Sequence, residues 1–415
     1  MSMLCKQLLH IIKRDTGLMD FQNINLFNVR LNLLSGNLLP MIDKSSFSLF
    51  WKVHMTFVWL LQLVYFTSLI LAYFSASNEN ELSDGSDGLY VIEAGGFIIC
   101  YLRIFTQKTL LQQMIRKLND ALNIEDENMR RIVITNLKLI KNPFRYYFVI
   151  SGCSSIFWCC STLPLILERN TFYHADFVTP AVFSKEPFSV GVFLLGNMII
   201  LGSNIYFFLK IIGMDVYTAH LISLITAQYQ YISSRLVLAF RNNKHPDNSN
   251  SREGNSEVDS LTAKEIKNLC RQHVNVIYIT LMLKKLISVN FFLIYLFNVF
   301  RFCFLILMAI KISENFFEGF SVILYTSGIA AQFYVLCACV QRLSEASSEI
   351  TNKAFHEDWN QFNLSIKRTF LLMTMASNNI EIKLSLLDRF NLSLPSFMSV
   401  LNQAYSIALL ILKMS

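Results

Sequence analysis

Charged residues are scarce in this chain, and their scarcity excludes an ordinary soluble protein. Only 16% of the 415 residues are Asp, Glu, Lys or Arg, whereas soluble globular domains carry about 25%. Glycine and proline are also few, at 14 and 7 residues, so long helices can run with few breaks. Because so few polar groups are available to cover a water-exposed surface, we expect the chain to lie largely in lipid.

Patterns that would indicate an enzyme, a metal site or a disulfide framework are also absent from the sequence. Most of the nine cysteines lie inside apolar runs, and Cys337 and Cys339 have no His or Cys partner at the spacing of a zinc site. No Ser/His/Asp set and no glycine-rich phosphate loop is found. The net charge of +7 is spread over several connections. We therefore expect no enzyme, no cofactor and no nucleic-acid partner.

Seven apolar runs are long enough to cross a bilayer, for which a helix needs about 20 residues. A mixed helix at 370–387 precedes the last run, and Asp388 and Arg389 interrupt the sequence between them. The seven predicted spans are 47–74, 89–105, 146–167, 187–214, 276–312, 316–340 and 392–412.

Lysine and arginine alternate between the two sides of these spans. The basic residues gather in the segments 1–46, 103–145, 241–271 and 341–369, whereas 75–88 contains none. Because positive residues are retained on the cytoplasmic side, the pattern predicts a cytoplasmic amino terminus and an external carboxyl terminus. This is the reverse of the orientation of G-protein-coupled receptors.

The later spans continue beyond the membrane as helices. The helical pattern that starts near 187 runs to about 240, and similar extensions cover 261–284 and 340–355. We therefore predict an all-α membrane protein in which extensions of spans four to seven form a cytoplasmic helical bundle. The predicted divisions are an amino-terminal cytoplasmic segment 1–46, spans one to four at 47–240, a disordered cytoplasmic loop at 241–260, spans five and six with anchor helices at 261–390, and a terminal helix at 391–415.

Several residues recur in an order typical of one receptor family. Gly213, Met214 and Asp215 lie in the long helix of span four, His273 lies at the start of span five, and Trp359 follows span six. With the inverted orientation, these features resemble the insect odorant receptor family from about residue 39 onward. The terminal residues that carry the resemblance are Ser393, Leu394, Phe397, Tyr405, Ser406 and Leu410.

The resemblance implies a ligand-gated cation channel in the plasma membrane of sensory neurons. In this family, odorant-specific subunits assemble with a shared co-receptor as a heterotetramer, and the short polar connection at 241–260 favours the odorant-specific subunit. Insect gustatory receptors share the architecture, but they usually end with a Gln-Phe pair that is absent after Tyr405. A solute transporter is a further alternative, although the internal repeat typical of transporters is not found.

The resemblance also implies an apolar ligand pocket in the outer half of the membrane between spans two, three, four and six. Small volatile odorants suit aromatic and aliphatic walls with few polar groups. The outer halves of these spans supply the predicted ligand-binding residues: Tyr90, Glu93, Ala94, Phe97, Trp158, Ser161, Thr162, Phe193, Asn197, Met198, Phe317, Phe320, Ser321, Leu324 and Tyr325.

Glu93 is the most distinctive of these residues, because an ionisable group inside a span is costly and often functional. Its carboxylate would suit a basic ligand such as an amine. The alternative is a hydrated position near the outer interface, where it would pair with Lys185 or Lys311.

The last span is implied to line the pore. The run 392–412 carries almost no charge, as expected of a gate that closes by dewetting. In register with the family, Leu410 falls at the apolar constriction, Ser406 one turn inward and Lys413 one turn outward. The positive charge of Lys413 would repel cations in the pore. Its side chain would therefore have to turn toward lipid headgroups, or partner subunits would have to lack a lysine at this position.

The predicted orientation leads to a first test. Asn363 and Asn391 begin Asn-Leu-Ser sequences that match the glycosylation pattern, yet both fall on the cytoplasmic side. We expect neither to be glycosylated when the chain is expressed in insect cells and treated with an endoglycosidase. An engineered acceptor within 75–88 is the matched control and should be modified. A mass shift from either natural position would reverse the orientation.

Overall fold

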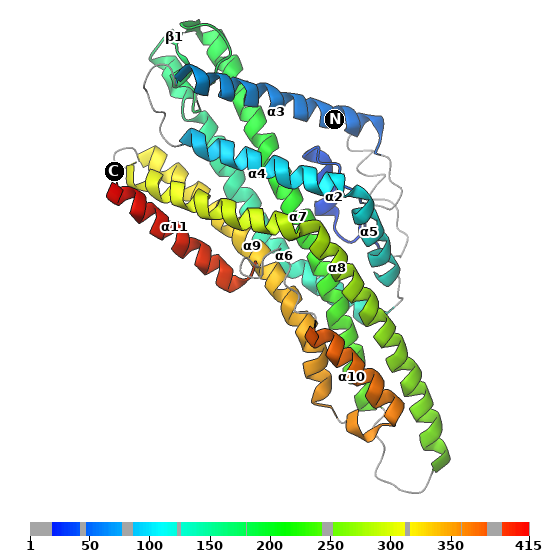
Figure 1. Ribbon diagram of the computed structural model, residues 1–415. Coiled ribbons are helices and arrows are strands. Elements are labelled where there is room, and N and C mark those ends of the chain that lie inside the picture. The colour runs from blue at the N-terminus through cyan, green and yellow to red at the C-terminus, as the bar shows by residue number, and fades with distance from the viewer. Residues whose placement is uncertain are drawn as a thin grey trace.

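The computed structural model describes residues 19–41, 47–76, 86–122, 126–179, 181–242, 252–311, 316–357, 359–379 and 392–414. Nearly all regular structure in this part of the chain is helical (Figure 1). The elements are α2 (Leu26–Leu34), α3 (Leu49–Ala76), α4 (Ser86–Thr106), α5 (Lys108–Leu122), α6 (Glu127–Cys160), β1 (Thr171–Phe172), β2 (Phe188–Ser189), α7 (Val190–Asn242), α8 (Arg252–Lys311), α9 (Phe316–Phe355), α10 (Leu364–Asn379) and α11 (Leu394–Met414), with short 3-10 turns at Leu163–Leu167, His174–Asp176 and Trp359–Gln361.

Six of the helices in the described residues are long and apolar enough to cross a membrane, namely α3, α6, α7, α8, α9 and α11. Helix α4 has a shorter apolar stretch, Gly95–Thr106. Multiple apolar helices in one chain make this a multi-pass membrane protein, as the composition predicted. The predicted count of seven spans depends on α4.

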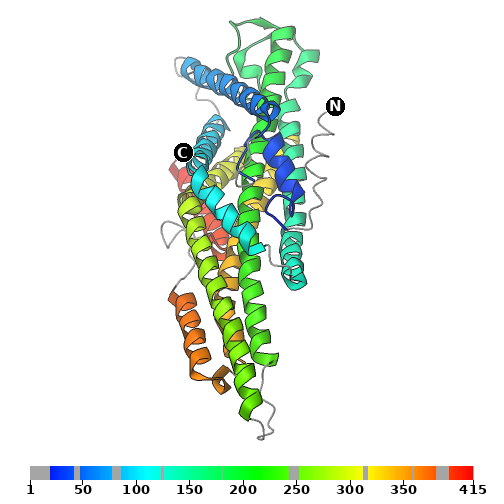
Figure 2. The ribbon, with the colours of Figure 1, turned by 90° about the vertical axis from the view of Figure 1, so that its right-hand side faces the viewer.

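Three helices are much longer than a bilayer requires. Helices α7, α8 and α9 contain 53, 60 and 40 residues, which at 1.5 Å per residue correspond to about 80, 90 and 60 Å. One end of all three continues past the apolar runs to meet α10, at the opposite end of the molecule from β1 (Figures 1 and 2). We call α10 and the adjoining ends of α7, α8 and α9 the distal bundle. It corresponds to the helical extensions that the sequence predicted.

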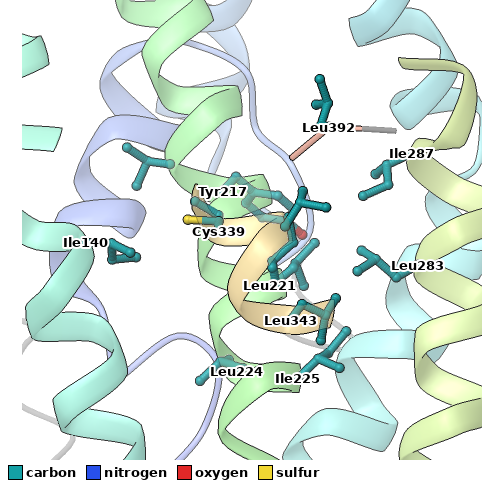
Figure 3. Packing of buried hydrophobic residues seen from close by; sticks show 14 of the residues in the cluster. Ile140, Tyr217, Leu221, Leu224, Ile225, Leu283, Ile287, Cys339, Leu343 and Leu392 are labelled. Carbon is teal, nitrogen blue, oxygen red and sulfur yellow. The ribbon is translucent and has the colours of Figure 1, made fainter. Parts of the chain in front are cut away.

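The core is organised around α7, because the middle of this helix is enclosed on every side. Every residue from Ile212 to Tyr229 is buried, a pattern expected only of a helix surrounded by neighbours. Figure 3 shows Tyr217, Leu221 and Ile225 of α7 directed among residues of α8 and α9. Helices α2, α6, α8 and α9 all pack against α7, so its position determines theirs.

The amino-terminal residues 19–41 belong to this core, whereas the sequence analysis treated 1–46 as a separate segment. The Tyr217 hydroxyl donates to the Pro40 carbonyl at 2.5 Å, and the Asn28 amide nitrogen lies 2.9 Å from Nδ1 of His220. Phe21 stacks on the His220 ring with a centroid distance of 4.5 Å. Polar groups on the enclosed face of α7 thus find partners in this segment, which a periodicity argument does not detect.

Other boundaries also differ from the sequence analysis. Helix α8 begins at Arg252, so residues 252–260, predicted as part of a disordered loop, are helical; 243–251 lie outside the described residues. The third span was predicted to end at 167, but α6 ends at Cys160 and a 3-10 turn with Pro164 in its first turn follows. The connection to α7 contains a two-stranded antiparallel hairpin, β1–β2, that was not predicted.

The start of α6 is tied to α7 near the distal bundle by a capping carboxylate. Asp126 accepts hydrogen bonds from the backbone nitrogen of Asn128 at 2.9 Å and from the Tyr231 hydroxyl at 2.8 Å. The bond from Tyr231 is the main reason that the pKa of Asp126 lies below its usual value. Since a lowered pKa favours the ionised carboxylate, this attachment is retained at neutral pH and weakens in acid.

Candidate functional site

A cavity of about 140 Å³ lies between α6, α7, α8 and α9. Thr179, from the connection between α6 and α7, covers it at the end that faces the β1–β2 hairpin, and the Thr179 side chain is held by Tyr65 of α3 at 2.6 Å. Phe207 and Phe208 are the aromatic residues that α7 contributes, beside Asn204 and Ile211. The remaining walls are formed by Leu305 and Met308 of α8 and by Val322, Tyr325 and Ile329 of α9.

The α6 wall is lined by small hydroxyl side chains. Ser151, Ser154 and Ser155 fall on one face of α6 between Tyr147 and Trp158, because residues three and four apart in a helix lie on the same side. The Ser155 hydroxyl donates to the Ser151 carbonyl at 2.9 Å, so this polar group is satisfied within its own helix. These small side chains leave space for the cavity beside α6, and the Ser155 hydroxyl is not left unpaired.

The end of the cavity nearest the distal bundle, which we call its floor, is polar. Helices α6 and α8 run away from the distal bundle and α7 and α9 run toward it, so Tyr147, Ile211, Arg301 and Gln332 are the deepest lining residues. An Arg301 guanidinium nitrogen donates to the Gln332 side-chain oxygen at 3.3 Å. The floor is thus made by one residue from each of four helices.

A buried carboxylate lies directly beneath the floor. The Gln332 amide nitrogen donates to Asp215 at 2.6 Å, and the Tyr147 hydroxyl also hydrogen-bonds this carboxylate, which faces the charge of Arg301. Asp215 is only 4% exposed. Burial of an isolated charge is very costly in such a place, and the charge of Arg301 and the hydrogen bonds from Gln332 and Tyr147 offset part of that cost for Asp215.

Two of the predicted ligand-binding residues line this cavity, Trp158 and Tyr325. Phe97 of α4 lies one layer behind, with its ring 5.6 Å from that of Phe207. The side chains of Tyr90, Glu93, Ala94 and Phe317 lie outside the described residues.

The predicted residues near the start of α7 lie elsewhere. Phe193 is stacked between Phe172 and Phe177, at 4.2 and 5.2 Å, in a separate apolar cluster beneath the β1–β2 hairpin. Asn197 accepts a hydrogen bond from Thr162 at 3.2 Å, and Met198 is 70% exposed. None of these four α7 and connection residues lines the cavity, because its first α7 residue, Asn204, lies about two turns deeper.

The remaining predicted residues are neighbours of the lining residues on other helix faces. Ser161 is exposed and donates to the Trp158 carbonyl at 2.8 Å. Phe320 packs edge-on against Phe157 at 5.7 Å. Ser321 is buried and Leu324 half-buried, but the adjacent Val322 and Tyr325 are the residues that reach the cavity.

The contribution of α8 and the depth of the cavity were not predicted. Asp215 entered the predictions only as part of a family pattern, and Arg301 was not among the predicted site residues. A charged residue within each of two spans is a recognisable signal of a functional position. That signal identifies Arg301 and Asp215, although it does not say that the two face each other.

The predicted pore residues share the outward side of α11. Val400, Ala404 and Ala408 are buried against the other helices, whereas Ser406, Leu410 and Lys413 are exposed. Leu410 is 59% exposed. Within the described part of the chain, no group of three or more His, Cys, Asp or Glu side chains could hold a metal ion.

The fold and the cavity define a multi-pass helical membrane protein with a mostly apolar chamber between four helices. The family model described as 7tm Odorant receptor matches residues 95–405, and the chain belongs to this family. The resemblance found in the sequence is thereby confirmed.

Solved structures agree with this fold. The insect olfactory receptor OR5 from Machilis hrabei superimposes with a TM-score of 0.76, and the same receptor in complex with eugenol with a TM-score of 0.74. In both comparisons the identity is 11%, and the match covers 96% of this chain and 100% of that chain. No curated protein matches the sequence. At this identity the structural likeness shows the fold alone.

The charge balance beneath the cavity leads to a stability prediction. Arg301→Met removes the cation whose charge acts on Asp215 and the donor to the Gln332 oxygen, and should lower the free energy of unfolding by about 2 kcal/mol, as expected when a hydrogen-bond partner of a buried group is lost. Adding Asp215→Asn removes the uncompensated charge and should restore most of that loss. Thermal unfolding of the detergent-purified variants measures both effects. Equal midpoints for the single variant and the wild type would contradict the pairing.

Proposed function

We propose that the chain is an odorant-specific receptor subunit that binds a small, mostly apolar volatile molecule and opens a non-selective cation channel. The mostly apolar cavity between α6, α7, α8 and α9 is the observation that carries this proposal. Its size suits a small organic molecule, and its walls combine aromatic and aliphatic side chains with few polar groups. The related receptor solved in complex with eugenol supports a ligand of this kind.

Ligand contacts in this proposal come first from the residues that line the cavity, including Trp158 and Tyr325. Phe97 would act through Phe207, against which it packs. The outer residues Phe193, Asn197 and Met198 are better suited to a path toward the cavity than to the bound position, since they lie nearer the β1–β2 hairpin. Glu93 remains a candidate for contact with a basic ligand.

Helices α8 and α9 connect the cavity to α11 in the proposed gating step. About two turns below Arg301, the Tyr295 hydroxyl lies 3.3 Å from that of Ser399. On α9, Phe333 follows Gln332 and packs against Phe397 with a centroid distance of 5.7 Å. A ligand that displaces the cavity walls of α8 or α9 would therefore move residues that hold the first turns of α11.

The outward side of α11 is suited to line a pore. Asn402, Ser406 and Leu410 recur at four-residue intervals, and Lys413 follows one turn later on the same side. Polar side chains directed out of an apolar spanning helix are costly in lipid, so water or other subunits should face them. Leu410 would form the constriction in this arrangement.

Assembly with an odorant co-receptor into a heterotetramer would cover the distal bundle. Helix α10 buries Ile366, Phe370 and Met373 against the bundle but leaves Leu372 and Met375 exposed, the former at 64%. If this region lies in the cytoplasm, as the basic residues indicate, such an apolar surface is expected to meet another protein. The proposed location is the plasma membrane of sensory neurons, with the amino terminus cytoplasmic.

The function is tested by expressing the chain with an insect odorant co-receptor and recording current during application of an odorant panel. We expect cation currents that require both subunits. Ser155→Phe, which places a large ring in the cavity, should abolish odorant responses while surface delivery is unchanged. Odorant-evoked current of normal size in Ser155→Phe would place the ligand elsewhere, and failure to assemble with the co-receptor would refute the proposed subunit role.

The constriction is tested by Leu410→Ala in the same cells. Removing most of the side chain should weaken the apolar seal and raise the current that flows without odorant. Leu412→Ala is the matched control, because it lies two residues further on, about 200° round the helix from Leu410, and is also exposed. Unchanged basal current and ion selectivity in Leu410→Ala would remove Leu410 from the gate.

A further inference from the structure

The floor of the cavity differs in chemistry from its walls. Of the described residues that line the cavity, Arg301 is the single charged one, and it lies in the deepest layer with Tyr147 and Gln332. Polar groups higher in the cavity are engaged with the protein: Thr179 with Tyr65, and the Asn204 amide nitrogen with the Cys159 sulfur at 3.3 Å. A ligand would thus meet mostly apolar surface, the serine hydroxyls of the α6 wall on one side, and a guanidinium at one end.

We propose that this cavity selects neutral odorants that carry a hydrogen-bond-accepting oxygen, such as ketones, aldehydes and esters. In this proposal Arg301 donates the hydrogen bond to that oxygen. The inference rests on the proposed ligand-binding function of the cavity. It adds the chemical class of the ligand and the direction in which the ligand lies, with its oxygen toward the distal bundle.

The need for an acceptor follows from the donors at the floor. A guanidinium has five N–H donors in a planar fork and no acceptor, so one group can serve Gln332 and a ligand oxygen together. The Gln332 amide is oriented by its neighbours, because its nitrogen donates to Asp215 and its oxygen accepts from Arg301. The Gln332 oxygen is thereby directed at Arg301 and is not offered to the ligand. The floor therefore favours a ligand group that accepts a hydrogen bond over one that donates.

The preference for a neutral ligand follows from the charge already present. Asp215 lies beneath the floor, buried and linked to Arg301 through Gln332, so an acidic group already lies close to the guanidinium. A carboxylate ligand would place a second acidic group within a region of low dielectric constant, where an unpaired charge is costly. An ammonium ligand would face the like charge of Arg301. A carbonyl oxygen gains a charge-assisted hydrogen bond without changing the balance.

The test measures binding to the purified full-length chain through the change in tryptophan fluorescence, since Trp158 lines the cavity. Trp158→Phe should remove most of the signal. The probes are matched in shape: cyclohexanone, cyclohexane, cyclohexanecarboxylic acid and cyclohexylamine, with acetophenone and ethylbenzene as an aromatic pair. Comparing the ketone-to-hydrocarbon affinity ratio between variants cancels the different hydration of the probes.

The decisive variant is Arg301→Met combined with Asp215→Asn, which removes both charges and leaves no uncompensated carboxylate. Loss of one charge-assisted hydrogen bond should lower the affinity ratio of ketone to hydrocarbon by about tenfold or more. Leu305→Ala, one turn from Arg301 in the apolar wall, should weaken both probes and leave the ratio within about twofold. In the wild type, the acid and the amine should bind more weakly than the ketone.

An unchanged ratio in the double variant would overturn the inference, as would tighter binding of the acid or the amine, or no binding of either ketone up to its solubility limit. These outcomes are separate from the test of the proposed function. Ketone selectivity without odorant-evoked current would refute the channel function alone. Current evoked equally by hydrocarbons and ketones would leave the receptor function intact and refute the role of Arg301.

Discussion

The carboxylate of Asp215 is the constraint on which the arrangement of the central helices depends. It lies inside α7, where every residue from Ile212 to Tyr229 is buried, and is only 4% exposed. Tyr147 of α6, Arg301 of α8 and Gln332 of α9 each supply a compensating group. Three helices are thereby held in register with α7 by electrostatics, in addition to apolar packing. The cost of losing a partner is high because the polar group left behind stays buried.

The same constraint explains where the cavity lies. The groups that compensate Asp215 occupy the space next to α7, and the chamber begins one layer above them. Between the floor and the first turns of α11, Tyr295 and Phe333 fill α8 and α9 positions that contact Ser399 and Phe397. The helices that line the chamber are thus the ones that hold α11, so a ligand needs no separate relay element to influence the terminal helix.

Features of the fold that depend on residues close together in the sequence could be predicted, whereas those that depend on contacts between distant residues could not. Apolar length and basic residues, which are local properties, identified the spanning helices and their extensions to about residue 240. The terminal pattern around Tyr405 identified the family. The position of the cavity depends on how far α6 and α7 are shifted along each other, and this shift is set by contacts such as that between Tyr147 and Asp215, which are distant in sequence. Phe193 and Asn197 therefore lie on a helix that lines the cavity, but about three and two turns from its first lining residue, Asn204.

The chain shares its fold with the solved receptor at only 11% sequence identity. This is consistent with a fold set by a few helix contacts and a cavity wall whose residues can vary. Backbone approach is restricted where Gly328 meets Ser151, since a Cβ at Gly328 would lie 2.3 Å from the serine hydroxyl. Such contacts, with the enclosure of α7, limit how the helices can be placed but leave the wall positions between them open to substitution. Ser154, Leu305 and Met308 can change in size without disturbing Asp215 or its partners. A receptor built in this way can alter the shape it accepts while the charged floor, and the ligand chemistry that it favours, stays the same.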